Sequence, residues 1–227
     1  MNIIRRKEPV IDSGNHCRSH CSFLKLHRQS EDKESGGDIM RSAFHDILID
    51  CPVIAAVKDD EGLEKCLESE SQIVFILYGD LIRIPQMVKK IKDAGKLAMV
   101  HIDLIAGLSG KEVAVDYIKQ ETLADGIIST KMAIVKRAKE LGLVTVFRFF
   151  VIDSIAFDNI RKQYHTVQPD VVEILPGLMP KIITKVSKLV SCPVIAGGLI
   201  ADKADIIGAI EAGATAISST NQTSGFI

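Results

Sequence analysis

Two short segments near the carboxyl end of the chain carry residue types that bind a phosphate. The run Pro193–Ile200 is apolar up to a pair of glycines, and the run Ala216–Thr220 ends in three hydroxyl side chains. Glycines let an anion reach backbone N–H groups, and hydroxyls add further donors. We expect a phosphate site here; a tight turn and a polar strand end without a ligand would use the same residues. The predicted phosphate ligands are Gly197, Gly198, Ser218 and Ser219.

Other charged side chains come directly after apolar runs of the sequence. They are Lys58, Asp103 and Lys131. A carboxylate in such a place accepts a ligand hydroxyl or acts as a base, and an ammonium attracts phosphate or forms a Schiff base. The alternatives are a carboxylate that caps a turn or helix, and lysines that are simply solvated.

Two further charges, Arg148 and Glu173, lie inside apolar runs. A buried carboxylate needs partners, and consecutive strands often pair, so these two side chains are expected to meet. Glu173 would then accept ligand hydroxyls while Arg148 holds it or reaches an anion. A purely structural ion pair explains both residues equally well. His101, which shares a strand face with Asp103, is predicted to be a core histidine rather than a catalyst.

These residues must be positioned by a regular alternation of apolar and amphipathic stretches that begins at residue 52. Short runs rich in Val and Ile are typical of buried parallel strands, and helical patterns separate them. The predicted strands are Pro52–Val57, Ile73–Leu77, Leu97–Ile102, Gly126–Ser129, Val144–Val151, Val171–Leu175, Pro193–Ala196 and Ala216–Ser219. The predicted helices include Ile82–Ala94, Ala133–Leu141, Ile155–Tyr164, Lys181–Leu189 and Lys203–Ala212.

Eight such strands predict an α/β fold, a compact (β/α)₈ TIM-like barrel. Ligands of this fold meet the carboxyl ends of the strands, and a phosphate site often follows strands seven and eight. The alternative fold is an open doubly wound sheet. Its dinucleotide-binding version is disfavoured, because no Gly-x-Gly-x-x-Gly motif follows the first strand.

The composition restricts the class of protein. Of the 227 residues 47% are hydrophobic, and the formal net charge is −1, so a globally basic nucleic-acid binder is not indicated. No apolar run is long enough to span a membrane and no signal peptide opens the chain, so we expect a soluble cytoplasmic protein. Because no Ser-His-Asp grouping, metal-ligand cluster or P-loop is visible, we expect neither a metal nor a cofactor.

Residues 1–39 differ from the rest of the chain. They mix charges, Ser, Gly, His and Cys without a sustained apolar period, which is typical of disorder. We expect a disordered leader that need not belong to the native protein, with Met40 as a second start. Residues 40–227 are expected to form a single ligand-binding barrel domain.

Six motifs follow one another in order through this domain. They are PVIAAVKD (52–59), HIDLIAGL (101–108), DGIISTK (125–131), RFFVIDS (148–154), EILPG (173–177) and PVIAGGLI (193–200). Together they make the region from Met40 to Ile227 resemble the glycerol uptake operon antiterminator family, the glycerol-3-phosphate-responsive regulators. The leader matches nothing in that family.

The resemblance implies a barrel that binds glycerol 3-phosphate and then binds leader mRNA of glycerol-utilisation genes, preventing transcription termination. It places the phosphate near the two glycines and two serines named above. The glycerol moiety would face Asp103, Glu173 and also Lys58, Lys131 or Arg148.

The RNA-binding surface cannot be assigned from the sequence. Three basic clusters could contact RNA phosphates, although each is also explained as a solvated helix face. A homodimer would join two modest patches into one surface. The clusters are Lys89, Lys90, Lys92 and Lys96; Lys136, Arg137 and Lys139; and Arg161, Lys162, Lys181, Lys185 and Lys188.

An enzyme remains the alternative to a regulator without turnover. A TIM-barrel lyase or isomerase acting on a small phosphorylated metabolite would use Asp103 or Glu173 as acid–base. It would use Lys58 or Lys131 as nucleophile or electrostatic clamp. The barrel supports either class equally, and the ordered motifs favour the regulator.

Overall fold

The computed structural model describes residues 33–221 of the chain. Chain contacts separate residues 1–32 from the unit Lys33–Ile227, so most of the expected leader lies outside the described residues. The last part of the expected leader, residues 33–39, lies within the described residues. Residues 33–39 are helical rather than disordered, and the expected boundary between residues 39 and 40 falls inside helix α2 (Lys33–Asp50).

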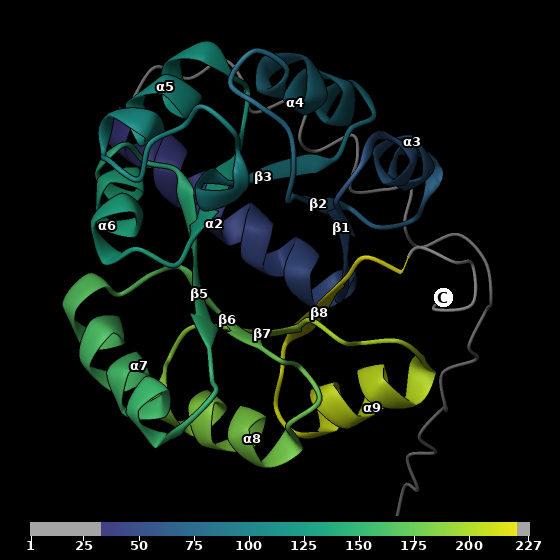
Figure 1. Cartoon of the computed structure of the whole chain (residues 1–227), viewed down its shortest axis with the longest axis vertical. Coiled ribbons are helices and arrows are strands. Elements are labelled where there is room, and N and C mark those ends of the chain that lie inside the picture. Colours follow the sequence, from purple (N-terminus) through teal and green to yellow (C-terminus); the bar gives the residue numbers. More distant parts are fainter. Residues whose placement is uncertain (1–32, 222–227) are drawn as a thin grey trace, which may run out of the picture. The chain divides into compact units, whose positions relative to one another are not determined.

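Eight parallel strands form a closed barrel in chain order, with β8 hydrogen-bonded back to β1. Figure 1 looks along the barrel and shows helices around its outside. Closure confirms the predicted (β/α)₈ barrel and excludes the open sheet. The strands are β1 (Val53–Val57), β2 (Ile73–Ile76), β3 (Leu97–His101), β4 (Gly126–Ser129), β5 (Val144–Phe150), β6 (Val171–Leu175), β7 (Val194–Gly197) and β8 (Ala216–Ser219).

Each predicted strand agrees with the structure to within one residue at either end. The five predicted helices are also present. In the described residues the barrel carries α3 (Asp60–Glu68), α4 (Ile84–Asp93), α5 (Val113–Glu121), α6 (Met132–Glu140), α7 (Ser154–Val167), α8 (Pro180–Leu189) and α9 (Lys203–Glu211), with a short 3₁₀ turn, η2 (Ile102–Leu104). No helix among these residues is long and apolar enough to cross a membrane.

Apolar side chains fill two separate layers. Successive strand residues point to opposite faces, so Ile54 and Ala56 of β1 lie in the cluster inside the barrel. Ala55 and Val57 lie in the larger cluster between strands and helices. On β3, β5, β6 and β8 the inner cluster ends before the carboxyl end of the strand, and the next inward positions are polar: His101, Arg148, Glu173 and Ser218.

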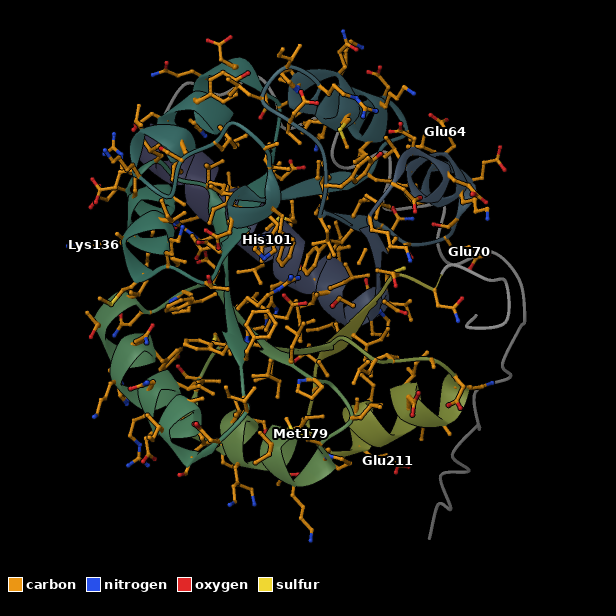
Figure 2. The ribbon with its side chains drawn as sticks, in the orientation of Figure 1. Glu64, Glu70, His101, Lys136, Met179 and Glu211 are labelled. Carbon is orange, nitrogen blue, oxygen red and sulfur yellow. The ribbon has the colours of Figure 1, made fainter. Side chains whose placement is uncertain are left out.

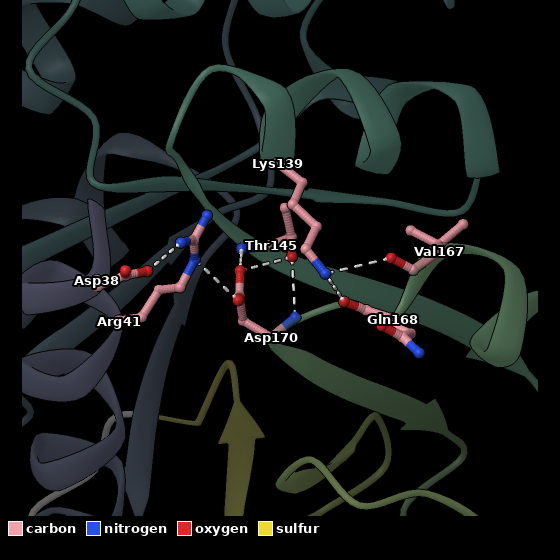
Figure 3. Close-up of polar contacts among 7 residues, drawn as sticks. All are labelled: Asp38, Arg41, Lys139, Thr145, Val167, Gln168 and Asp170. Atoms are coloured by element: carbon pink, nitrogen blue, oxygen red, sulfur yellow. Dashed lines mark hydrogen bonds and ion pairs between the residues drawn. The ribbon is translucent and has the colours of Figure 1, made fainter. Parts of the chain in front are cut away.

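Helix α2 packs against the inner cluster at the amino-terminal end of the barrel. Phe44 and Leu48 are fully buried among the inward side chains of the strands. An ion pair also ties the helix to the turn before β6: Arg41 Nε lies 3.1 Å from Asp170 Oδ1. The other carboxylate oxygen of Asp170 accepts hydrogen bonds from the backbone and hydroxyl of Thr145 (Figure 3). Phe44 and Leu48 of α2 therefore cover the amino-terminal end of the barrel interior, which we call the floor of the barrel.

Candidate functional site

The predicted meeting of Arg148 and Glu173 occurs inside the barrel. The two residues are register partners on β5 and β6, and Arg148 Nε donates to Glu173 Oε2 at 2.6 Å. Glu173 is completely buried, and its other oxygen accepts a 2.6 Å hydrogen bond from the hydroxyl of Ser218. Both carboxylate oxygens thus have protein partners. In the described part of the chain, the Nη atoms of Arg148 make no hydrogen bond.

The absence of a side chain at Gly197 permits the hydrogen bond between Ser218 and Glu173. It pairs with Ser218 across β7 and β8. A Cβ atom at position 197 would stand 2.5 Å from the Ser218 hydroxyl and 2.6 Å from Glu173 Oε1. Those separations are far below van der Waals contact, so any side chain there would break the bond between Ser218 and Glu173. The predicted phosphate glycine therefore has a second role, in shaping the buried polar network.

His101 points into the barrel from the end of β3, where Figure 2 shows it near the centre of the ring. Its side chain is buried, and its Nδ1 atom has no hydrogen-bond partner among the described residues. Burial, reinforced by the positive charge of Arg148, lowers the pKa of His101 to about 4. The imidazole is therefore neutral at physiological pH. The prediction of a core histidine is consistent with this burial, but the unpartnered nitrogen faces the polar interior.

A second polar cluster joins the end of β3 to the end of β4. Oxygen Oδ2 of Asp103 accepts from the Ser129 hydroxyl at 3.0 Å and from the backbone and hydroxyl of Thr130 at 2.8 and 3.1 Å. Burial alone would raise the pKa of Asp103, but these donors hold it below its usual value. The other oxygen accepts no hydrogen bond from the described residues, and Nζ of Lys131 lies 3.5 Å from it.

The remaining predicted ligands lie at the carboxyl ends of β7, β8 and β1. The Ser219 hydroxyl donates to the carbonyl of Ile200 at 3.1 Å. Gly198 and Leu199 both adopt positive φ, +73° and +63°. Positive φ at a leucine costs roughly 1–2 kcal/mol and marks the turn after β7 as strained. Lys58 is exposed beyond the end of β1.

The structure thus brings the predicted residues together as two clusters and a rim. Arg148, Glu173, Gly197 and Ser218 form one buried network, and Asp103 with Lys131 forms the other. The charges of both clusters act on His101: that of Arg148 lowers its pKa and that of Asp103 raises it. No three His, Cys, Asp or Glu side chains of residues 33–221 gather as a metal site.

An open groove of about 810 Å³ lies on the outside of the barrel, along β1 and beside α3. It reaches the strand ends at Lys58 and Ser219. The groove does not include Asp103, Arg148 or Glu173. The buried networks, and not this larger hollow, hold the concentration of convergent polar groups that a small-ligand site needs.

Comparison with known families gives this arrangement a context. A family model described as "Glycerol-3-phosphate responsive antiterminator" matches residues 53–223, which include every residue of the two clusters. The chain belongs to this family. Antitermination, a form of transcription regulation in glycerol metabolism, is therefore the functional class of the protein, and the resemblance seen in the six motifs is confirmed.

Relatives of the antiterminator family span the same barrel. The uncharacterized protein YgcP of Escherichia coli K12 is 49% identical over 170 residues, which are 75% of this chain and 89% of that protein. A glycerol uptake operon antiterminator regulatory protein from Listeria monocytogenes has a similar structure, with a TM-score of 0.73 and 32% identity over 76% of this chain and 93% of its own. A related Thermotoga maritima protein has a TM-score of 0.66 and 34% identity, covering 75% and 95%.

Aldolases share the fold of the antiterminator barrel at much lower identity. Deoxyribose phosphate aldolase from Aeropyrum pernix is 14% identical with a TM-score of 0.61, covering 87% of this chain and 97% of its own. This likeness shows the fold alone. It assigns no chemistry to the antiterminator clusters.

Two sets of hydrogen bonds in this candidate site were not predicted from the sequence. Ser129 and Thr130 are visible only as hydroxyls at a strand end, and their bonds to Asp103 depend on the lateral pairing of β3 with β4. The contact between Ser218 and Glu173 joins residues 45 positions apart. The inward alternation of β6 and β8 would have been the signal for it, because Glu173 and Ser218 both fall on the inner face.

Proposed function

We propose that the protein is a glycerol-3-phosphate-responsive transcription antiterminator that binds leader mRNA of glycerol-utilisation genes in the cytoplasm. The family description and the likeness to the Listeria regulatory protein support the regulatory half of this proposal. The ligand half is supported by one observation above the others. A guanidinium inside the barrel is held by Glu173 through Nε alone, which leaves the Nη fork of Arg148 to meet an anion.

The proposed pose sets the phosphate at the ends of β7 and β8 and the glycerol toward β3. Because the hydroxyls of Ser218 and Ser219 already donate within the protein, the phosphate would be bound by backbone N–H groups around Gly197 and Gly198. Ser218 then acts by holding Glu173. Asp103 Oδ1, with Lys131 beside it, is the acceptor for a ligand hydroxyl. Lys58 contributes charge at the rim.

Binding without turnover fits the lysines better than Schiff-base chemistry does. A nucleophilic lysine is activated by desolvation or by a neighbouring cation. The Lys131 side chain is 51% exposed and sits beside a carboxylate, and Lys58 is exposed. Neither lysine has the environment that the alternative lyase mechanism requires, and we propose that the protein returns its ligand unchanged.

We also propose a homodimer, supported by exposed apolar side chains after β5, at the start of α7 and after β7, which are the strand ends on either side of β6. Ile152 is 81% exposed, Ile155 70% and Leu199 72%. Exposed apolar side chains on one rim favour a protein interface, and a twofold pairing of identical rims is the commonest way to cover them.

The test of the ligand is calorimetric titration of the full chain with glycerol 3-phosphate, using inorganic phosphate and glycerol as controls. We expect saturable binding that clearly exceeds both controls, and the same ligand recovered intact by NMR afterwards. Arg148→Lys keeps a charge beside Glu173 but removes the fork, so it is expected to weaken binding by roughly tenfold or more. The exposed Arg161→Lys change on α7 is the matched control.

Equal heats for glycerol 3-phosphate and inorganic phosphate would contradict the assignment of the diol to Asp103. Conversion of the ligand to a product would replace the sensor with an enzyme. An Arg148→Lys protein that binds as tightly as the wild type would remove Arg148 from the site.

A further inference from the structure

Three of the four lysines in the basic cluster around α4 are ion-paired within the protein, and the fourth, Lys96, is buried. Each of the four lysines has an acceptor, so the cluster presents little uncompensated charge to a polyanion. The pairs are Lys89 with Asp93, Lys90 with Glu64, Lys92 with Asp125, and Lys96 with the backbone carbonyls of Ser69 and Ser71.

Most of the cluster on α6 is compensated as well. Arg137 pairs with Asp116 and Glu140. Lys139 donates to the carbonyls of Val167 and Gln168, as Figure 3 shows. Lys136 alone of this cluster is exposed without an ion pair to a described carboxylate, and it lies on the outside of α6 in Figure 2.

The outer face of α7 and α8 is different. Its five cations are Arg161, Lys162, Lys181, Lys185 and Lys188. All five are exposed, and no ion pair joins any of them to a carboxylate of residues 33–221. Helix α8 contains no acidic residue at all, and α7 contains only Asp158. Uncompensated positive charge among the described helices is therefore concentrated here.

The geometry of this face suits a phosphate backbone. Spacings of four and three residues put Lys181, Lys185 and Lys188 on one side of α8. Lys185 Nζ lies 5.9 Å from the ring centre of Phe157, a contact that joins α8 to α7. Figure 1 shows the two helices side by side on the same part of the ring. A row of cations on two adjacent rigid helices can follow a strand of phosphates.

We propose that the outer face of α7 and α8 is the surface that binds RNA phosphates. This assignment rests on the proposed function, and it adds the location that the basic clusters of the sequence left open. RNA fits better than a lipid surface, because α8 exposes no large apolar side chain among its lysines. Binding here is electrostatic and weakly dependent on base sequence.

The experiment compares two triple variants of the full chain that remove equal charge. The test variant is K181Q/K185Q/K188Q on α8. The control variant is K65Q/K89Q/K90Q, whose lysines are similarly exposed but paired with Glu61, Asp93 and Glu64. The probes are a labelled transcript of the leader that precedes glycerol-utilisation genes in the source genome, and poly(U) of equal length. Affinity is measured from about 0.05 to 0.3 M salt with glycerol 3-phosphate present.

Single-strand contacts contribute a slope of about 0.7 each, so the α8 variant is expected to lose about two from the salt slope and roughly 100-fold in affinity near 0.1 M salt. The control variant is expected to stay within about threefold of the wild type. Calorimetry with glycerol 3-phosphate should give the same binding for all three proteins, because none of the changed residues lies in the ligand clusters.

Four results would overturn the assignment. An α8 variant that binds RNA like the wild type would move the surface elsewhere, and equal losses in both variants would reduce the effect to net charge. If the wild-type protein binds glycerol 3-phosphate but binds neither the leader transcript nor poly(U) at low salt, the proposed RNA-binding surface and the proposed binding of leader mRNA would both be wrong. That result would leave the ligand half standing. Cosedimentation with anionic lipid vesicles in place of RNA would assign the face to a membrane.

Discussion

Inside the barrel, Arg148 serves two neighbours with opposite needs. It compensates the buried carboxylate of Glu173, and its charge opposes protonation of His101. A neutral imidazole beside a guanidinium is the stable arrangement, because a second positive charge there would be both desolvated and repelled. We therefore expect His101 to contribute to the loss of folding stability at acidic pH.

This electrostatic arrangement predicts a pH dependence of stability. The pKa of His101 is lowered from 6.5 to about 4 in the folded protein, so between these values the unfolded chain binds more protons. Stability should rise with pH over this window and be lost as the pH falls through it, by at most about 3 kcal/mol from this group. Urea unfolding of His101→Gln at pH 4.5 to 7 should show a shallower slope than the wild type.

His165→Gln on the exposed part of α7 is the control for that series and should keep the wild-type slope. The slopes, rather than the absolute stabilities, carry the comparison, because any change in the core lowers stability at every pH. A His101→Gln protein with the full wild-type slope would mean that carboxylates alone cause the acid loss.

At the level of elements, the strands could be predicted closely and the first helix could not. Buried parallel strands are continuous runs such as Ile73–Ile76, so their composition reveals them directly. Helix α2 begins with Gly36 and Gly37 in its first turns and has weak apolar periodicity. Its stability comes from contacts of Phe44 and Leu48 with strands far along the chain, which no local pattern records.

The floor formed by α2 is expected to be a major source of stability. Phe44→Ala removes a fully buried ring from the inner cluster and should cost about 3–5 kcal/mol. Ile49→Ala changes a 54% exposed side chain on the same helix and should cost less than about 0.5 kcal/mol. Thermal or urea unfolding of the two variants measures both. Equal small effects would show that α2 is only loosely attached.

A chain that starts at Met40 would keep the buried residues of α2 and the pair between Arg41 and Asp170. It would lose the exposed pair of Arg41 with Asp38, which contributes little. The second start suggested by the sequence is therefore compatible with the folded barrel.

For the whole molecule, the polar residues at the strand ends and the pairing of Arg148 with Glu173 could be predicted, but the other contacts of the candidate site could not. The barrel puts every strand end at one rim, which is why Asp103, Lys131 and Gly197 could be gathered from the sequence. Which hydroxyl meets which carboxylate depends on lateral register, as the bond from Ser218 to Glu173 shows. The division into two clusters around His101 became visible only in three dimensions.

The proposed dimer is a prediction at this scale. Sedimentation equilibrium of the full chain is expected to give twice the chain mass of 24.8 kDa. I152E/I155E places two charges in the exposed apolar patch and should shift the mass toward the monomer. Ile82→Glu changes an 86% exposed residue after β2, on another part of the rim, and should leave the dimer intact. A monomeric wild type would refute the pairing.

The basic face of α7 and α8 has a counterpart across the ring. Helix α3 carries four acidic residues and one lysine, and Figure 1 shows it on the far side of the barrel from α7. Three of the α3 carboxylates are ion-paired, with Lys65, Arg83 and Lys90, whereas the cations of α7 and α8 are not paired with a described carboxylate, so the described part of the chain has an electric dipole moment whose positive end lies at α7 and α8. In the electric field of RNA, the protein is expected to rotate so that α7 and α8 face the RNA before the two molecules touch. More encounters then begin in the binding orientation, and the association rate is higher than the net charge alone would give. The acidic side, with the outer groove along β1, then faces away from the nucleic acid.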